Sequence, residues 1–200
     1  LATVQADSSG QWLYAATFND GGHFITARAK DLSGNLSEAT AVAQLSIDTT
    51  APTTPAQPML ASGQDSGSVN NDGVTRFSQP VFTGTVEAGS IVGLFDNGVL
   101  VGSAVAHATT GLYTISPSMA LTQGAHSITV QAIDLAGNRS STSAPKAITV
   151  DSVISAISYL RVASADVLYS SGGEVVTTSA RPTVEGFGEA GATVTVYNNG

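Results

Sequence analysis

The stretch Gly124-Ala-His-Ser-Ile-Thr-Val-Gln-Ala-Ile-Asp-Leu-Ala-Gly-Asn138 decides the fold, and the chain contains it twice. The earlier copy reads Gly21-Gly-His-Phe-Ile-Thr-Ala-Arg-Ala-Lys-Asp-Leu-Ser-Gly-Asn35 and keeps the same register throughout. In the later copy, apolar and polar residues alternate from His126 to Ala132, which predicts a β-strand with one apolar face. The Asp-Leu-x-Gly-Asn sequence that follows both copies is typical of a turn. The chain is therefore expected to consist of repeated strand-and-turn units.

Other segments recur in the same order. Leu-Ser-Ile-Asp48 returns as Ile-Thr-Val-Asp151, and the Asn97-Gly98 pair returns as Asn199-Gly200. The segment Pro80-Val-Phe-Thr-Gly-Thr-Val-Glu-Ala-Gly89 returns as Pro182-Thr-Val-Glu-Gly-Phe-Gly-Glu-Ala-Gly191. These copies predict three parts: the C-terminal half of one repeat (1–48), a complete repeat (49–151) and the N-terminal half of a third, more divergent repeat (152–200).

Composition restricts the class of protein. Apolar residues make up 42 % of the 200 residues and charged residues only 11 %, with 21 glycines, which favours short strands and turns over helices. The net charge of −8 argues against partners that need clusters of Lys and Arg, namely nucleic acids and anionic membranes. The chain has no cysteine, which excludes disulfides and thiolate metal sites. It also has no apolar run long enough to insert into a membrane.

The complete repeat is expected to hold about seven short strands. Asn97-Gly98 suits the positive φ angles of a tight hairpin turn, and Gly111-Leu-Tyr-Thr-Ile115 predicts another strand, in which Tyr113 occupies the position of Trp12 in the first repeat. We interpret that shared position as a core position. About seven strands in a hundred residues is typical of an immunoglobulin-like sandwich. The predicted fold is therefore all-β, with tandem immunoglobulin-like β-sandwiches joined by short linkers.

The sequence resembles the bacterial Ig-like, Bap-like tandem repeats of giant surface adhesins that are exported by type I secretion. The resemblance covers the whole chain and rests on Asp48-Thr-Thr-Ala-Pro52, Asp65-Ser-Gly67, Asn71-Asp-Gly73, Gly84-Thr-Val-Glu-Ala-Gly89, Asp96-Asn-Gly98 and Asp134-Leu-Ala-Gly-Asn138. Residues 163–175 depart from it, because the paired-aspartate loop lacks its usual form there. The resemblance implies an extracellular protein of the bacterial surface, cell adhesion or biofilm formation, and calcium at the junctions between repeats.

Strand directions in such a sandwich bring three carboxylates to one junction. The turn after the strand at 80–86 carries Glu87, the turn after the strand at 126–134 carries Asp134, and the linker that begins at Asp48 enters at the same pole. Carboxylates gathered in a small space repel one another unless a cation joins them, and oxygen ligands favour Ca²⁺. The hypothesis is a structural Ca²⁺ site at Asp48, Glu87 and Asp134. The alternative is that Asp134 and Asn138 only form a hydrogen-bonded turn.

Further candidate ligands follow from the repeat. Asp151 and Glu189 would serve the next junction, and Asp31 the preceding one. Asp65 and Asp72 form a second candidate set in a long loop, with a solvated acidic turn as the alternative. Asp96 is interpreted as a hairpin residue and not as a ligand.

No catalytic constellation accompanies these repeats. His23 and His126 recur at one strand position, which is typical of packed structural histidines, and no nucleophile elbow, phosphate-binding loop or zinc-protease motif occurs. The prediction is that the chain is not an enzyme. Its function is expected to be that of a structural spacer, with neighbouring repeats of the same chain as partners and host glycans or biofilm matrix bound through other regions. The alternatives are a glycan- or protein-binding module, or accessory repeats of a large secreted hydrolase.

Overall fold

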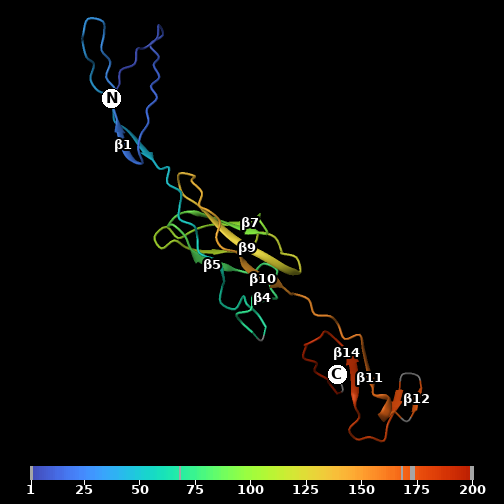
Figure 1. Ribbon diagram of the computed structural model, residues 1–200. Helices are drawn as coiled ribbons and strands as arrows, with labels where there is room; N and C mark the ends of the chain where they lie inside the picture. The colour runs from blue at the N-terminus through green and yellow to red at the C-terminus, as the bar shows by residue number, and fades with distance from the viewer. Residues whose placement is uncertain (1, 68, 168, 172–173, 199–200) are drawn as a thin grey trace. The chain divides into compact units, whose positions relative to one another are not determined.

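A computed structural model describes residues 2–67, 69–167, 169–171 and 174–198 of the chain (Figure 1). The chain forms two compact units, Leu1–Asp151 and Ser152–Gly200. Strands are the main regular elements of both units, as the sequence predicted, and only Ser164–Asp166 form a short 3₁₀ turn in the described part of the chain. No helix among the described residues is long and apolar enough to cross a membrane. The predicted Asn199-Gly200 turn lies outside the described residues.

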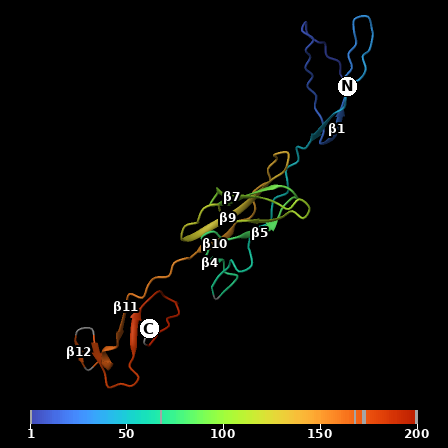
Figure 2. The same ribbon diagram turned by 180° about the vertical axis from the view of Figure 1, so that it is seen from behind.

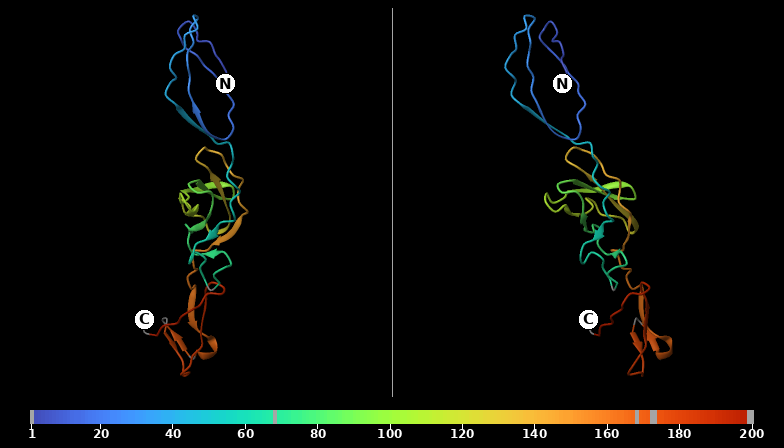
Figure 3. Two further views of the ribbon diagram at one scale, coloured as in Figure 1. Left: turned by 90° about the vertical axis from the view of Figure 1, so that its left-hand side faces the viewer. Right: turned by 60° about the vertical axis from the view of Figure 1, so that its left-hand side comes forward.

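Residues 49–151 fold into two packed sheets, as the prediction of an Ig-like sandwich requires. The smaller sheet has three strands in the order β3 (Met59–Leu60), β5 (Phe82–Thr85) and β8 (Leu112–Ile115). The larger sheet has five strands in the order β4 (Val74–Thr75), β10 (Lys146–Val150), β9 (Gly124–Ile133), β6 (Ile91–Asp96) and β7 (Val99–Val105). Figure 2 shows these strands from behind, and Figure 3 gives two further views.

The core lies between the two sheets. In β9, every second residue from His126 to Ala132 is buried and faces the core, as the alternation in the sequence predicted. The largest fully buried apolar side chains are Phe82 from the smaller sheet and Leu94 and Ile128 from the larger sheet. Tyr113 is only 3 % exposed, which confirms its expected place in the core. Burial of such side chains contributes roughly 1.5–3 kcal/mol each to folding.

The first strand of the complete repeat is split between the sheets. The sequence predicted one strand at about 56–61, but β3 covers only Met59–Leu60 and pairs with β5. After a loop, Val74–Thr75 form β4 and pair in parallel with β10. Pro55 and Pro58 explain the late start of β3, because proline has no N–H to donate to a ladder. The same segment of chain therefore provides an edge strand to each sheet, β3 to the smaller and β4 to the larger.

Residues 2–48 contain one antiparallel ladder, β1 (Gly21–Ile25) with β2 (Ala43–Ile47). No second sheet covers this ladder among the described residues. The expectation that Trp12 is a core residue is therefore wrong for this chain: its side chain is 58 % exposed, although Tyr113 at the equivalent position is buried. The difference follows from the missing opposite layer, since a side chain is buried only where a second sheet packs on it.

Residues Ser152–Gly200 form two short antiparallel ladders. β11 (Tyr159–Val162) pairs with β14 (Val184–Phe187), and β12 (Tyr169–Ser171) pairs with β13 (Glu174–Val176). The pairing of β11 with β14 repeats the pairing of β3 with β5. The divergent stretch at 163–175 accounts for the 3₁₀ turn and for β12, which have no equivalent in the complete repeat.

Candidate functional site

The loop from Asp134 to Asn138 is closed by its own side chains. The Asn138 backbone N–H donates to Oδ1 of Asp134 at 2.8 Å, and the Asn138 amide Nδ2 donates to Oδ2 at 2.9 Å. Gly137 has a φ of 94°, in the left-handed region that a residue without a side chain adopts easily. The hydrogen-bonded turn that the sequence offered as an alternative is therefore present. Both Asp134 oxygens therefore accept hydrogen bonds from Asn138.

The Asp134 carboxyl is anionic at neutral pH. Its residue is only 7 % exposed. Burial raises the pKa of the Asp134 carboxyl, but the hydrogen bonds from Asn138 and from the Gly137 and Ala136 amides outweigh it and hold the pKa below its ordinary value.

The first repeat contains the same loop. Asn35 donates to Asp31 through its backbone N–H at 2.8 Å and through its side-chain amide at 2.7 Å. The Asn35 side chain and backbone, in that order, lower the pKa of the Asp31 carboxyl, with the Ser33 amide adding to the effect. The geometry of the loop is therefore a property of the Asp-Leu-x-Gly-Asn sequence, independent of its surroundings.

In the complete repeat, this loop also holds the linker from the first repeat. Asn138 Nδ2 donates a second hydrogen bond to the backbone carbonyl oxygen of Asp48 at 3.0 Å. The register that pairs Ile91 with Ile133 places the turn containing Glu87 at the same end of the sheet as Asp134. The predicted meeting of the Asp48 linker with the Asp134 loop is confirmed by this contact, whereas Glu87 is exposed and its side chain makes no hydrogen bond in the described part of the chain.

A second carboxylate holds the linker from the side of the first repeat. Oδ1 of Asp20 accepts hydrogen bonds from the Thr49 hydroxyl at 2.7 Å and the Thr49 N–H at 3.1 Å, and Oδ2 accepts from the Thr50 hydroxyl at 2.7 Å. The hydroxyl of Thr50 and then that of Thr49 lower the pKa of the Asp20 carboxyl. Sequence reasoning missed Asp20. One signal for it was available in the Asp48-Thr49-Thr50 run. The hydroxyls of Thr49 and Thr50 need hydrogen-bond acceptors, and Asp20 directly precedes β1.

Three prolines fix the rest of the linker on the complete repeat. Pro52, Pro55 and Pro58 are all buried, and their spacing of three matches the three residues per turn of a polyproline II helix. One face of the linker is thereby packed along its length. The second linker differs, since residues 151–158 contain no proline and are all exposed.

No three His, Cys, Asp or Glu side chains lie close enough to hold a metal ion within the described ranges. At the second junction, Glu189 Oε2 accepts a hydrogen bond from the Ser155 N–H at 2.8 Å, and the Asp151 N–H donates to the Thr75 carbonyl oxygen at 2.8 Å. The carboxylates of the second candidate set each accept a backbone N–H, Asp65 from Gly73 and Asp72 from Val74. Calcium binding by the predicted residues stays a prediction.

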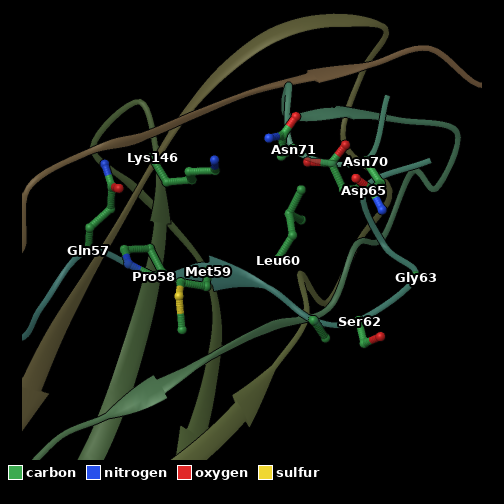
Figure 4. A pocket seen from close by; sticks show the side chains of 11 residues that line it. Gln57, Pro58, Met59, Leu60, Ser62, Gly63, Asp65, Asn70, Asn71 and Lys146 are labelled. Atoms are coloured by element: carbon green, nitrogen blue, oxygen red, sulfur yellow. The ribbon is translucent and has the colours of Figure 1, made fainter. Parts of the chain in front are cut away.

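Asp65 differs from the other candidate ligands. Its Oδ1 atom is buried and has no hydrogen-bond partner in the described residues. Asp65 lines a pocket of about 390 Å³ together with Asn70, Asn71 and Lys146 (Figure 4). Asp65 and the two asparagines lie on one side of this pocket, and Lys146 enters from another. An unpartnered buried carboxylate oxygen costs free energy, so this atom is the described oxygen best suited to gain a cation as partner.

The two recurrent histidines are hydrogen-bonded structural residues, as expected. Nε2 of His126 lies 2.9 Å from the Thr122 carbonyl oxygen, and Nε2 of His23 lies 2.8 Å from that of Asn19. His126 has a further contact that the sequence did not reveal, because its Nδ1 lies 2.8 Å from Oδ2 of Asp96 at the end of β6. Asp96 is therefore a partner of a core histidine as well as a hairpin residue.

Three comparisons with known proteins gave one family match. No curated protein matches the chain. Among solved structures, one described as the BSP domain of a biofilm associated protein is similar, at 22 % identity and a TM-score of 0.35; the match covers 68 % of this chain and 20 % of that one, so the chain spans about a fifth of its length. Residues 51–152, which form the complete two-sheet sandwich, match the bacterial Ig-like domain. The chain belongs to the bacterial Ig-like domain family.

Proposed function

We propose that the chain is a non-catalytic spacer in a large bacterial surface adhesin, where its repeats separate an adhesive region from the cell and contribute to cell adhesion or biofilm formation. The observation that carries the proposal is the linker at residues 48–58. It is held by Asp20 of the first repeat, by Asn138 of the second, and by three buried prolines. A joint held from both sides resists bending, which is what a spacer requires.

Calcium at the junctions is the finer part of the proposal, together with export by type I secretion. The Asp134 carboxylate is anionic and is fixed by Asn138, and Ca²⁺ takes carboxylate oxygens as ligands, so it fits the role of a ligand. Asp48 and Glu87 would complete the site. Bound Ca²⁺ would supply positive charge that removes the repulsion among these carboxylates, and an ion that binds only the closed joint stabilises that joint.

Isothermal titration of the whole chain with CaCl₂ tests the calcium site. Asp134→Ala is expected to remove one binding event, because the best-fixed ligand is lost. Asp31→Ala is the matched control: it removes the equivalent carboxylate from the first repeat and leaves the Asp48–Glu87–Asp134 set intact. Equal binding by Asp134→Ala and the unmodified chain, or no binding tighter than millimolar, would show that calcium is not held at this junction.

Asp65→Asn distinguishes the second candidate site from the junction. It removes one charge and keeps the size of the side chain. If the pocket binds calcium, Asp65→Asn lowers the number of ions bound while the event that depends on Asp134 remains. Small-angle scattering with and without chelator then tests the spacer role, since a stiffening ion must increase the maximum dimension of the chain.

A further inference from the structure

The linker that leaves the first repeat is held at consecutive residues from two sides. Asp20, which directly precedes β1, accepts hydrogen bonds from Thr49 and Thr50. Asn138 of the second repeat donates to the carbonyl oxygen of Asp48. We call residues 48–50 the first joint. A bend at this joint requires rotation about its backbone φ and ψ bonds, and contacts with both repeats oppose that rotation.

Every donor of the two threonines is bound to a carboxylate oxygen. Oδ1 of Asp20 accepts the Thr49 hydroxyl at 2.7 Å and the Thr49 N–H at 3.1 Å, and Oδ2 accepts the Thr50 hydroxyl at 2.7 Å. The remaining donor, the Thr50 N–H, is 3.1 Å from Oδ1 of Asp48. Hydrogen bonds to an ionised acceptor are stronger than those between neutral groups. The conformation of the joint is therefore fixed by side chains of the chain itself.

Uncharged donors, not a cation, stabilise the Asp20 carboxylate. The Thr50 hydroxyl, then the Thr49 hydroxyl and the Thr49 N–H, lower the pKa of the Asp20 carboxyl below its ordinary value, so the folded joint favours the ionised form. The three hydrogen bonds occupy both oxygens of this carboxylate. The contact thus forms without a metal ion.

The second joint, residues 151–153, has different side chains at the same repeat positions. Gln123 stands at the position of Asp20, and Val153 stands at that of Thr50. A glutamine side chain has one acceptor oxygen instead of two, and valine has no hydroxyl to donate. The three hydrogen bonds of the first joint therefore cannot form at the second.

We propose that Asp20, Thr49 and Thr50 form a latch that keeps the first joint rigid without a metal ion, and that the chain bends at the second joint, which lacks this latch. The inference rests on the proposed spacer role, because it states where such a spacer is stiff and where it yields. Calcium bound at the first joint would add to the latch and not replace it.

Spin-label distances in the whole chain, measured with EDTA present, test the latch. Ser46→Cys with Thr114→Cys reports on the first joint, and Thr114→Cys with Thr183→Cys reports on the second; all three positions are exposed, and the chain has no native cysteine. The first distance distribution is expected to be narrow and the second broad. Asp20→Gln and Thr50→Val each place a residue of the second joint in the first, and each should broaden the first distribution.

Asp7→Gln is the matched control. The Asp7 carboxylate also accepts three hydrogen bonds, from the Ser9 hydroxyl at 2.6 Å, the Ser9 N–H at 2.8 Å and the Gln11 N–H at 2.9 Å, but none of them involves the linker. Because Asp20 and Thr50 act through one contact, the double variant should broaden the distribution no further than Asp20→Gln alone. If Asp20→Gln fails to fold by circular dichroism, Thr50→Val, which keeps the shape of the side chain, carries the test.

The outcomes separate the latch from the proposed calcium site. The latch is overturned if both joints of the unmodified chain give equally broad distributions, or if Asp7→Gln broadens the first as much as Asp20→Gln does. A first distribution that is broad in EDTA and narrows only with CaCl₂ assigns the rigidity to the metal ion and also overturns the latch. Calcium binding that depends on Asp134 is measured separately by titration, so either proposal can fail without the other.

Discussion

Nδ2 of Asn138 lies 3.0 Å from the backbone carbonyl oxygen of Asp48, 90 positions earlier in the chain. The same amide lies 2.9 Å from Oδ2 of Asp134. One side chain thus closes a loop of the second repeat and ties that loop to the linker from the first. The two N–H groups of an amide allow both bonds at once, which neither a serine nor an aspartate could provide.

Replacing Asn138 is expected to loosen the joint. Asn138→Ala leaves the Asp48 carbonyl oxygen without its donor, so the distance distribution between spin labels at Ser46→Cys and Thr114→Cys should broaden. The chain has no native cysteine, which makes such labelling specific. Asn35→Ala is the control, because it opens the equivalent loop without touching a linker. Equal broadening in both variants would show that the Asp48 contact does not restrain the joint.

Acid is expected to destabilise the chain through Asp134. Its pKa is lower in the folded chain than the ordinary value of 3.8, so the ionised carboxylate stabilises the folded state at pH values above that value. This contribution is lost as the pH falls through the lowered pKa. In Asp134→Asn, unfolding by urea should therefore give lower stability at pH 7 and a weaker dependence on pH below about 4. If the stability of Asp134→Asn depends on pH below about 4 as strongly as that of the unmodified chain, the acid effect does not come from Asp134.

The two linkers are expected to differ in resistance to proteolysis. Pro52, Pro55 and Pro58 are buried in the first, whereas residues 151–158 of the second are exposed. Val153 also stands where Thr50 provides a hydroxyl to Asp20. Thermolysin should therefore cut first near Val153 and Ile154, because cleavage requires an accessible extended segment. Mass spectrometry of the early fragments checks the position, and first cleavage between 49 and 58 would refute the expectation.

The strands could be predicted, and so could the end of the sandwich at which the Asp48 linker meets the Asp134 loop, because both depend on local patterns. Alternation located β9, and counting chain reversals placed Asp134 beside the Asp48 linker. Neither β4 nor the contact of Asp20 with Thr50 could be found in this way. β4 has only two residues, too few for a periodic pattern.

Contacts between distant side chains were also missed because they depend on register. The bond between His126 and Asp96 spans 30 positions and exists only because Asp96 pairs with Ile128 across β6 and β9. A shift of one residue would turn Asp96 to the opposite face of the sheet. No feature of the sequence fixes that register on its own.

The pair Gly84 and Tyr113 shows how one strand position accommodates a large ring. The two residues are opposite each other in β5 and β8, and a Cβ at Gly84 would lie 2.7 Å from Cζ of Tyr113. Gly84→Ala is expected to cost about 1–3 kcal/mol through overpacking, and Tyr113→Leu in the same chain should recover part of that loss. Thermal unfolding of the unmodified chain, the two single variants and the double variant measures the coupling free energy between the two positions. Additive effects would contradict a direct clash.

The Tyr113 hydroxyl provides an independent check of the same site. Its oxygen is buried without a hydrogen-bond partner in the described residues, and burial raises its pKa to about 12. Tyr113→Phe should therefore leave the stability equal or slightly higher, since no hydrogen bond is lost. Titration followed by tyrosinate absorbance should lose its most alkaline step in this variant. A loss of more than about 1 kcal/mol would reveal a partner for the hydroxyl.

The His126 ring lies between two hydrogen-bond acceptors, the Thr122 carbonyl oxygen and the Asp96 carboxylate. Both ring nitrogens therefore have a hydrogen-bond partner, and the side chains of His126 and Asp96 are only 5 % and 15 % exposed. Asp96→Asn is expected to cost about 1–3 kcal/mol in urea unfolding, because it weakens a buried hydrogen bond to the ring. His126→Gln should cost a similar amount, and the double variant less than the sum.

The neighbouring repeats provide controls for this pair. In the described residues, the His23 ring makes one hydrogen bond, to the Asn19 carbonyl oxygen, packs against the Phe18 ring and is half-buried, so His23→Gln should cost no more than about 1 kcal/mol. In the third repeat, Asn198 stands at the position of Asp96, so Asp96→Asn reproduces a residue that the chain itself uses there. If Asp96→Asn is as stable as the unmodified chain, the carboxylate is not what holds the histidine. If Asp96→Asn loses stability, the buried pair fixes the end of the β6–β9 ladder, where Asp96 pairs with Ile128.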